Sequence, residues 1–162
     1  MNAAHYHLLL NHLPIIFPIA GLLVLIGGFI FRSEIVKRTS FVIFIIAALS
    51  AIAASSTGDG AEEAIEHLPG ISERLIHAHE EAAETFSIIL YLLGGFSVIA
   101  LWANWKQKSY SGLLSWFVIG FSVVVLFFSK QTGTSGGIIR HTEIRTDTTG
   151  IQGGQEQNSN DD

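Results

Sequence analysis

The stretch TFSIILYLLGGFSVIALWANW, residues 85–105, decides the fold class because it contains no aspartate, glutamate, lysine or arginine. A helix rises about 1.5 Å per residue and the hydrocarbon core of a bilayer is roughly 30 Å thick, so this run is long enough to cross it. Every backbone polar group in lipid must be satisfied internally, which favours a helix over an irregular segment. The stretch therefore predicts a transmembrane helix.

Three further runs, residues 8–31, 39–58 and 109–129, also lack these charged residues. Four such runs in a chain of 162 residues predict an all-α protein, an integral membrane four-helix bundle, rather than a soluble helical domain. We expect the helices over residues of about 8–31, 39–57, 72–104 and 110–130, within one transmembrane domain, 1–145. Residues 146–162 are polar and rich in Gly, Asn, Gln and Asp, which predicts a disordered tail.

Composition excludes several other classes of protein. Charged residues make up 14% of the chain, against about 25% in soluble domains. The absence of cysteine excludes disulfides, thiolate ligands and a cysteine nucleophile. The net charge of −5 and the lack of a basic stripe argue against nucleic acid as a partner. The first apolar run has no positive segment before it, so it does not resemble a cleavable signal peptide.

Basic residues in the short connections predict the orientation. Arg32, Lys37 and Arg38 lie between the first two helices, and Lys106 and Lys108 lie between the last two. The positive-inside rule places both connections in the cytoplasm, and both chain termini on the outer side. A bacterial inner membrane is the expected location, with an aromatic belt at its inner boundary. The belt residues are Trp102, Trp105, Tyr110 and Trp116.

The ionisable residues are distributed unevenly between the two sides. All seven histidines fall on the outer side or in the outer ends of the helices: His5, His7, His12, His67, His77, His79 and His141. Glu62, Glu63 and Glu66 predict a short outer helix with a solvated face. The outer end of the bundle is therefore the expected place for chemistry.

On a helix over residues 72–104, His77, Glu81 and Glu84 share one narrow face. Ile88 and Tyr91 continue that face toward the membrane. Ionisable groups near hydrocarbon usually face the bundle interior, so we expect this stripe to point inward. His79 falls on a different face, and it is expected, like His5 and His7, to be interfacial or exposed.

The first helix offers His12 as a partner for this stripe. Leu13-Pro14 follows His12, and a proline in a membrane helix can bend it near a site. At the other end of the chain, Gly136-Gly137 is expected to break the last helix. The chain could then fold back over the mouth of the bundle and bring Arg140 and His141 to the same place.

Several functions fit this His/carboxylate cluster, and the residues leave them open. Histidines on facing helices suit haem, and a bundle core can host a cofactor. Histidine and glutamate also suit Zn, Fe or Mn, although the chain has no Glu-x-x-His motif of the di-iron type. No charge enters the inner half of any helix, which argues against a continuous transport pathway. A purely structural pair between His12 and Glu84 is the remaining alternative.

The leading hypothesis is electron transfer with haem b bound at the outer end. His12 and His77 would be the axial ligands, Glu81 and Glu84 would orient them, and Arg140 would pair with a propionate. His141 is a further candidate ligand. The runner-up is a non-haem transition metal held by His12, His77, Glu81 and Glu84 for binding or sensing. A third reading is a structural subunit that docks a redox partner.

The sequence points to a protein that is not a stand-alone enzyme, since no GxSxG-type nucleophile elbow occurs. The lipid bilayer is the expected surrounding. A respiratory or redox membrane complex and a second copy of the chain are the candidate protein partners.

Four segments carry a resemblance to a known family: NHLPIIFPIAGLL (11–23), TGDGAEEAIEHLPG (57–70), HEEAAE (79–84) and GGIIRHTEIR (136–145). They resemble uncharacterised bacterial four-helix membrane proteins with an HP…HFPIAL-like first helix. Relatives in that family are sometimes joined to Rieske-type iron–sulfur domains, so the resemblance implies a redox or respiratory setting. This chain departs from the pattern, because Asn11-His12-Leu13-Pro14 replaces an adjacent His-Pro, and isoleucine replaces the histidine before Phe17. The resemblance therefore implies His5 or His77 as a substitute ligand.

Overall fold

The computed structural model describes residues 3–64 and 72–140, and within these residues the chain forms α-helices and no strand. The helices are α1 (Ala3–Leu10), α2 (Leu13–Ile30), α3 (Glu34–Ser55), α4 (Gly58–Glu63), α5 (Glu73–Trp105) and α6 (Ser111–Arg140). Four helical segments are long and apolar enough to cross a membrane: His5–Ile30, Glu34–Ser55, Glu73–Trp105 and Ser111–Ile139. The prediction of an all-helical chain with four helices long and apolar enough to cross a membrane is confirmed for the described residues.

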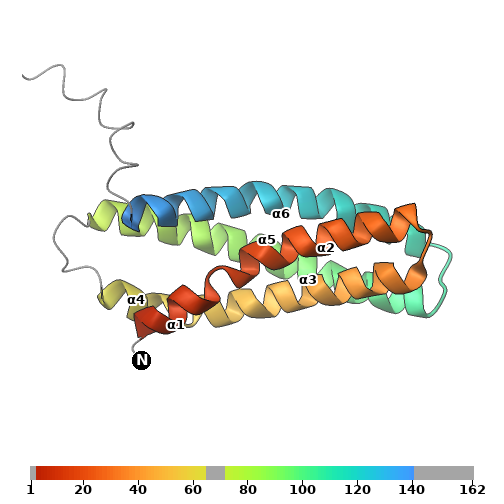
Figure 1. Ribbon diagram of the computed structural model, residues 1–162, viewed down its shortest axis with the longest axis horizontal. Helices are drawn as coiled ribbons and strands as arrows, with labels where there is room; N and C mark the ends of the chain where they lie inside the picture. The colour runs from red at the N-terminus through yellow and green to blue at the C-terminus, as the bar shows by residue number, and fades with distance from the viewer. Residues whose placement is uncertain (1–2, 65–71, 141–162) are drawn as a thin grey trace, which may run out of the picture.

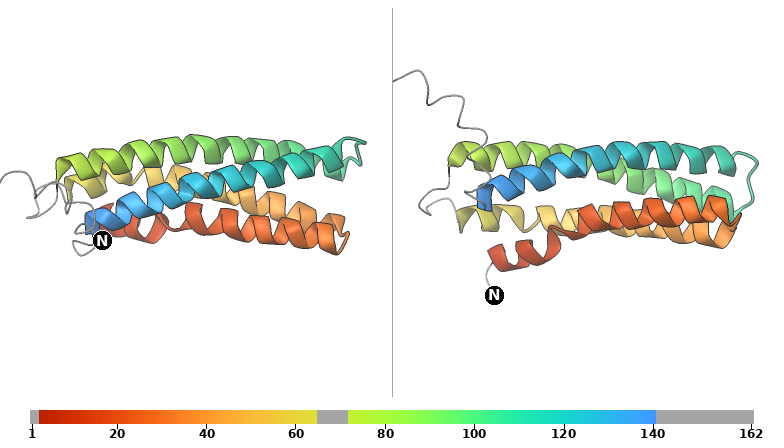
Figure 2. Two further views of the ribbon diagram at one scale, coloured as in Figure 1. Left: turned by 90° about the horizontal axis from the view of Figure 1, so that it is seen from above. Right: turned by 45° about the horizontal axis from the view of Figure 1, so that its top comes forward.

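The long helices run up and down in one elongated bundle (Figure 1). In chain order, α2 packs along α3, α3 along α5 and α5 along α6, whereas α2 and α6 touch over a smaller part of their length. We call the end that holds α1, α4 and the last turns of α6 the histidine end. It carries the described histidines His5, His7, His12, His77 and His79. The opposite end, with residues 31–33 and 106–110, is the turn end (Figure 2).

All four long helices contribute to the core. Its larger fully buried apolar side chains include Leu25, Phe41, Phe44, Leu90, Leu93, Val118 and Val125. Glycines allow close packing at two points. A Cβ added at Gly21 would lie 2.7 Å from the Phe44 ring, and one added at Gly94 would lie 2.5 Å from the Cβ of Ala48. Small residues thus bring α3 close to both α2 and α5, as is common between membrane helices.

A hydrogen-bonded network closes the turn end. The buried Asn104 side-chain amide donates to the Glu34 carboxylate, and Arg38 donates from Nε to the Asn104 Oδ1 at 2.6 Å. Lys37 Nζ bonds the other Glu34 oxygen at 2.8 Å and lies 4.5 Å from the centre of the Phe29 ring. These contacts fasten the start of α3 to the end of α5.

Apolar side chains cover the outside of the bundle on every long helix. Leu23 is 65% exposed, Leu49 59%, Val98 51% and Phe127 61%. Such a continuous apolar surface suits contact with lipid and would be costly in water. The tryptophans expected in the aromatic belt, Trp102, Trp105 and Trp116, are also exposed, toward the turn end.

The first predicted helix, residues 8–31, is divided in two. A turn at Asn11 and His12 separates α1 from α2. Pro14 explains the break, because its ring would clash with the carbonyl of Leu10 in a continuous helix. Proline is well tolerated at the start of a helix, and Pro14 occupies that place in α2.

The prediction that glycines break the last helix is wrong. Helix α6 continues through Gly136-Gly137 to Arg140, so the chain does not fold back there over the bundle mouth. Helical glycine costs only about 1 kcal/mol, which tertiary contacts can offset. Here α5 runs alongside, and Thr132 Oγ1 donates to the Ala82 carbonyl at 2.9 Å.

Candidate functional site at the histidine end

The polar stripe of α5 faces outward, so the prediction that it points into the bundle is wrong. Glu81 and Glu84 are exposed, and Ile88 and Tyr91, which continue the stripe, are 51% and 37% exposed. The opposite face of α5 carries the buried Phe86 and its apolar neighbours, and this apolar face packs into the core instead of the polar stripe. Burial of the apolar face therefore decides how α5 is rotated.

His77 belongs to this outer surface. Its side chain is 64% exposed, and its Nδ1 lies 3.1 Å from a Glu80 oxygen on the same helix. A second carboxylate, from Glu73, lies 3.9 Å from Nε2. Both contacts run along one helix turn, and only the one to Glu80 is short enough for a hydrogen bond.

His12 lies exposed at the turn between α1 and α2. Its carbonyl accepts from the amides of Ile15 and Ile16, but its side chain makes no capping hydrogen bond. In the described part of the chain, no hydrogen bond or ion pair joins His12 to Glu84. The expected structural pair between these two residues is therefore not formed.

The structure does not bring the expected ligands together into a metal site. Within residues 3–64 and 72–140, no three side chains of His, Asp or Glu cluster closely enough to hold a metal ion. Arg140 is the last residue of α6, and His141 lies outside the described residues. Whether His12, His77, Glu81, Glu84, Arg140 and His141 serve a cofactor stays a prediction.

The histidines that do turn inward are two others. His7, on α1, is partly buried, and its Nδ1 lies 3.1 Å from the carbonyl of Ala54 and 3.2 Å from Oγ1 of Thr57. A carbonyl oxygen only accepts, so Nδ1 must carry the proton. Thr57 donates its own hydroxyl proton to the same Ala54 carbonyl at 2.9 Å, so it too can accept from the ring. His7 is therefore held as the Nδ1–H tautomer.

His79, on α5, is the second inward histidine. Its Nδ1 lies 2.9 Å from the Ser135 hydroxyl on α6, and that hydroxyl donates to the Thr132 carbonyl at 3.0 Å. Because the serine proton is already used, Ser135 accepts from the ring. The ring packs over Gly136, where an added Cβ would lie 3.1 Å from Cε1. His79 is thus also held as the Nδ1–H tautomer.

Both rings make the hydrogen bonds described above through Nδ1, and the Thr132 carbonyl of α6 is a further acceptor for the His79 ring. The two rings lie close enough to each other for a protonated His7 to act electrostatically on His79. Glu80 acts on His79 as well, and Glu62 of α4 lies within hydrogen-bonding reach of Glu80. The histidine end therefore gathers two oriented imidazoles and two carboxylates from α1, α4 and α5.

Comparisons with family models, curated proteins and solved structures found no match for this chain. The resemblance to the four-helix family therefore stays a prediction, as do its redox implications.

Proposed function

We propose that this chain is a multi-pass protein of the bacterial inner membrane that holds a redox cofactor at its histidine end and takes part in electron transfer. Haem b is the first candidate, with His7 and His79 as the axial ligands in place of His12 and His77. The observation that carries the proposal is the shared tautomer of the two inward imidazoles. Each keeps its proton on Nδ1, in a bond to a neighbouring helix, and leaves its lone pair on Nε2.

This arrangement has the donor chemistry that an iron or other transition metal requires. Imidazole binds metals as the neutral ring, and a second hydrogen bond from Nδ1 to an oxygen fixes the tautomer and the ring orientation. Bound haem would supply one-electron chemistry through its iron, and the protein would supply ligands and surroundings. His7 is oriented by Ala54 and Thr57, and His79 is oriented by Ser135.

The charge of the two bundle ends supports the proposed orientation, in which both termini face outward. Arg32, Lys37 and Arg38 are at or next to one connection of the turn end, and Lys106 and Lys108 are in the other. Lysine and arginine in short loops are retained on the cytoplasmic side. The histidine end then faces the outer compartment, where a separate redox partner or respiratory complex would meet it.

A structural role is the second candidate, and a specific observation favours it. The hydrogen bonds of His7 join α1 to the end of α3, and the bond of His79 joins α5 to α6. Both rings therefore tie helices together without any ligand. In that case the histidine end would be a rigid surface on which a redox partner or a second copy docks.

The deciding experiment is an absorption spectrum of the detergent-purified chain, oxidised and dithionite-reduced, with elemental analysis of the same sample. His7→Ala and His79→Ala are compared with the exposed pair His12→Ala and His77→Ala. A Soret band lost in the first pair supports the proposal. A band lost only in the second pair restores the ligands expected from the sequence.

Two other results would reject haem. Stoichiometric metal without a Soret band would indicate a non-haem metal site, with ligands found from the same four variants. A colourless, metal-free protein, expressed with ample iron and haem precursor, would leave the structural role. In that case His7→Ala and His79→Ala should lower thermal stability, and His12→Ala and His77→Ala should not.

A further inference from the structure

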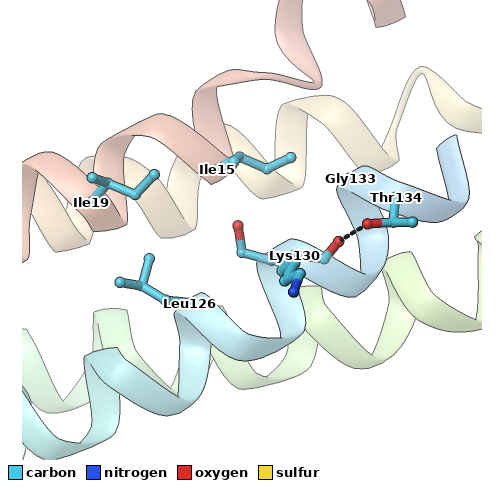
Figure 3. A pocket seen from close by; sticks show the side chains of 7 residues that line it. Ile15, Ile19, Leu126, Lys130, Gly133 and Thr134 are labelled. Carbon is cyan, nitrogen blue, oxygen red and sulfur yellow. Dashed lines mark hydrogen bonds between the residues drawn. The ribbon is translucent and has the colours of Figure 1, made fainter. Parts of the chain in front are cut away.

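Two open grooves flank α6 near the histidine end. The α2–α6 groove, with a volume of about 560 Å³, lies between Ile15 and Ile19 of α2 and Leu126 of α6 (Figure 3). The α5–α6 groove, of about 670 Å³, is walled toward the bundle centre by Thr85 and Phe127. These wall residues belong to the charge-free runs, so both grooves open toward hydrocarbon. The α5–α6 groove also includes Ser135, the partner of the His79 ring, but neither groove is lined by His7 or His79.

Lys130 joins the two grooves. It lines both of them, together with Thr134, whose hydroxyl donates to the Lys130 carbonyl (Figure 3). Lys130 directly follows the uncharged run 109–129, which puts its ammonium at the edge of the hydrocarbon. A lysine there reaches toward lipid headgroups.

Glu81 lines the α5–α6 groove together with Lys130. Both side chains are exposed, and they form no ion pair with each other or with any other described residue. One groove mouth thus presents a cation and an anion separately. A ligand that carries both signs of charge can neutralise both.

We propose that α6 holds one phosphatidylethanolamine-type phospholipid. Its phosphate binds Lys130, its primary ammonium binds Glu81, and its two acyl chains lie in the two grooves on either side of α6. Charge complementarity selects this headgroup. A phosphatidylglycerol has no cation for Glu81, and the quaternary ammonium of a phosphatidylcholine has no proton to donate to it. Two chains and one headgroup match two apolar grooves that meet at a single lysine.

Native mass spectrometry of the full chain in detergent tests this proposal. Phosphatidylethanolamine, phosphatidylglycerol and phosphatidylcholine with identical acyl chains are added separately. We expect one retained phosphatidylethanolamine per chain, bound roughly fivefold more tightly than the other two, the size of effect expected for one ion pair. Lys130→Gln should weaken retention of both phosphatidylethanolamine and phosphatidylglycerol. Glu81→Gln should remove the difference between these two lipids.

Matched variants separate this site from general lipid association. Lys106→Gln removes an exposed cation at the turn end, and Glu84→Gln removes an exposed carboxylate one turn from Glu81. Neither variant should change the preference for phosphatidylethanolamine over the other two lipids. Gly133→Leu fills the α2–α6 groove beside Ile15 without changing charge and should weaken retention. Gly120→Leu, on the same helix but with nothing within 4 Å of an added Cβ, should not.

Equal binding of the three lipids would overturn the proposal, as would equal effects of Lys130→Gln and Lys106→Gln. Tighter binding of phosphatidylglycerol that does not depend on Glu81 would show simple attraction of anionic lipid instead. Helicity and elution volume of each variant are measured on the same sample, so a loss of retention counts only in folded protein.

Discussion

The imidazole of His79 and the hydroxyl of Ser135 are 2.9 Å apart, and the hydroxyl proton is directed to the Thr132 carbonyl. The ring must therefore be the donor, and the direction of this bond fixes which nitrogen is protonated. His7 reaches the same state by a different route, through the Ala54 carbonyl at the end of α3. Two side chains from separate helices thus present the same unprotonated atom, Nε2, at one end of the bundle.

Ser135→Ala removes the side-chain acceptor of the His79 ring and leaves the Thr132 carbonyl as its acceptor. We expect the free energy of unfolding to fall by about 1 kcal/mol, the usual net value of such a bond, and the His79 ring signals to move as the ring turns toward its remaining acceptor. Unfolding in mixed detergent micelles gives the first quantity, and ¹⁵N NMR of the histidine rings gives the second. Thr134→Ala, a neighbouring exposed hydroxyl bonded only within α6, is the control, and its effect should stay within about 0.5 kcal/mol. A wild-type His79 protonated on Nε2 would contradict the assignment.

Gly136→Ala should move the His79 ring while leaving stability almost unchanged. The added Cβ would lie 3.1 Å from Cε1, so the ring must shift by a few tenths of an ångström, and this cost offsets the gain in helix propensity of roughly 1 kcal/mol. The imidazole NMR signals of His79 report the shift. Gly137→Ala meets nothing within 4 Å, so it should stabilise α6 and leave those signals in place. Unmoved signals in Gly136→Ala would show that the ring does not pack there.

The sequence predicted the four membrane-length helices because a long uncharged run can be recognised from local composition alone, without knowledge of tertiary contacts. The rotation of α5 was predicted wrongly from the stripe of His77 and Glu84. Helix α5 begins about three turns before Thr85, outside the uncharged run, where a polar side chain can face water at little cost. The helical spacing of the apolar residues predicts the rotation of α5 better than the polar stripe does. Phe86, Leu93 and Ala100 are buried at a spacing of seven, and the same spacing extended backward reaches His79.

His7 could not be identified in the same way. Its partners, Ala54 and Thr57, lie about fifty residues further along the chain, and the principal acceptor is a backbone carbonyl. Every residue has a backbone carbonyl, so the residue type does not reveal which carbonyl accepts a hydrogen bond. The break that separates α1 from α2 also changes the helical phase, so the position of His7 cannot be extrapolated from α2.

Cysteine labelling tests the orientation, because the chain has no cysteine of its own. Ser72→Cys places one thiol at the histidine end, and Ser109→Cys places one at the turn end, both at exposed positions. With a membrane-impermeant maleimide, we expect Ser72→Cys to react in intact cells and Ser109→Cys to react only after permeabilisation. The positive-inside rule predicts this order from the basic residues near Ser109. The opposite pattern would place the histidine end in the cytoplasm.

Asn104→Ala should be strongly destabilising. Asn104 is buried, and its amide group joins the Glu34 carboxylate to the Arg38 guanidinium. Hydrogen bonds to charged groups are worth about 1.5–3 kcal/mol, so we expect the free energy of unfolding to fall by about 2–3 kcal/mol. Lys106→Ala, an exposed change two residues further along, should cost less than about 0.5 kcal/mol. Similar losses in the two variants would show that the network does not hold α3 to α5.

The neighbouring glycines of α5 should respond to the same substitution in opposite directions. A Cβ at Gly94 would lie 2.5 Å from the Cβ of Ala48, so Gly94→Ala must separate α3 from α5, and overpacking of this kind costs about 1–3 kcal/mol. Gly95 has nothing within 4 Å of an added Cβ, and Gly95→Ala should stabilise the helix by up to about 1 kcal/mol. Unfolding in mixed micelles measures both. Adding Ala48→Gly to Gly94→Ala restores the lost space and should recover most of the stability. If the double variant were as unstable as Gly94→Ala alone, close approach of α3 and α5 at this point could not be the cause.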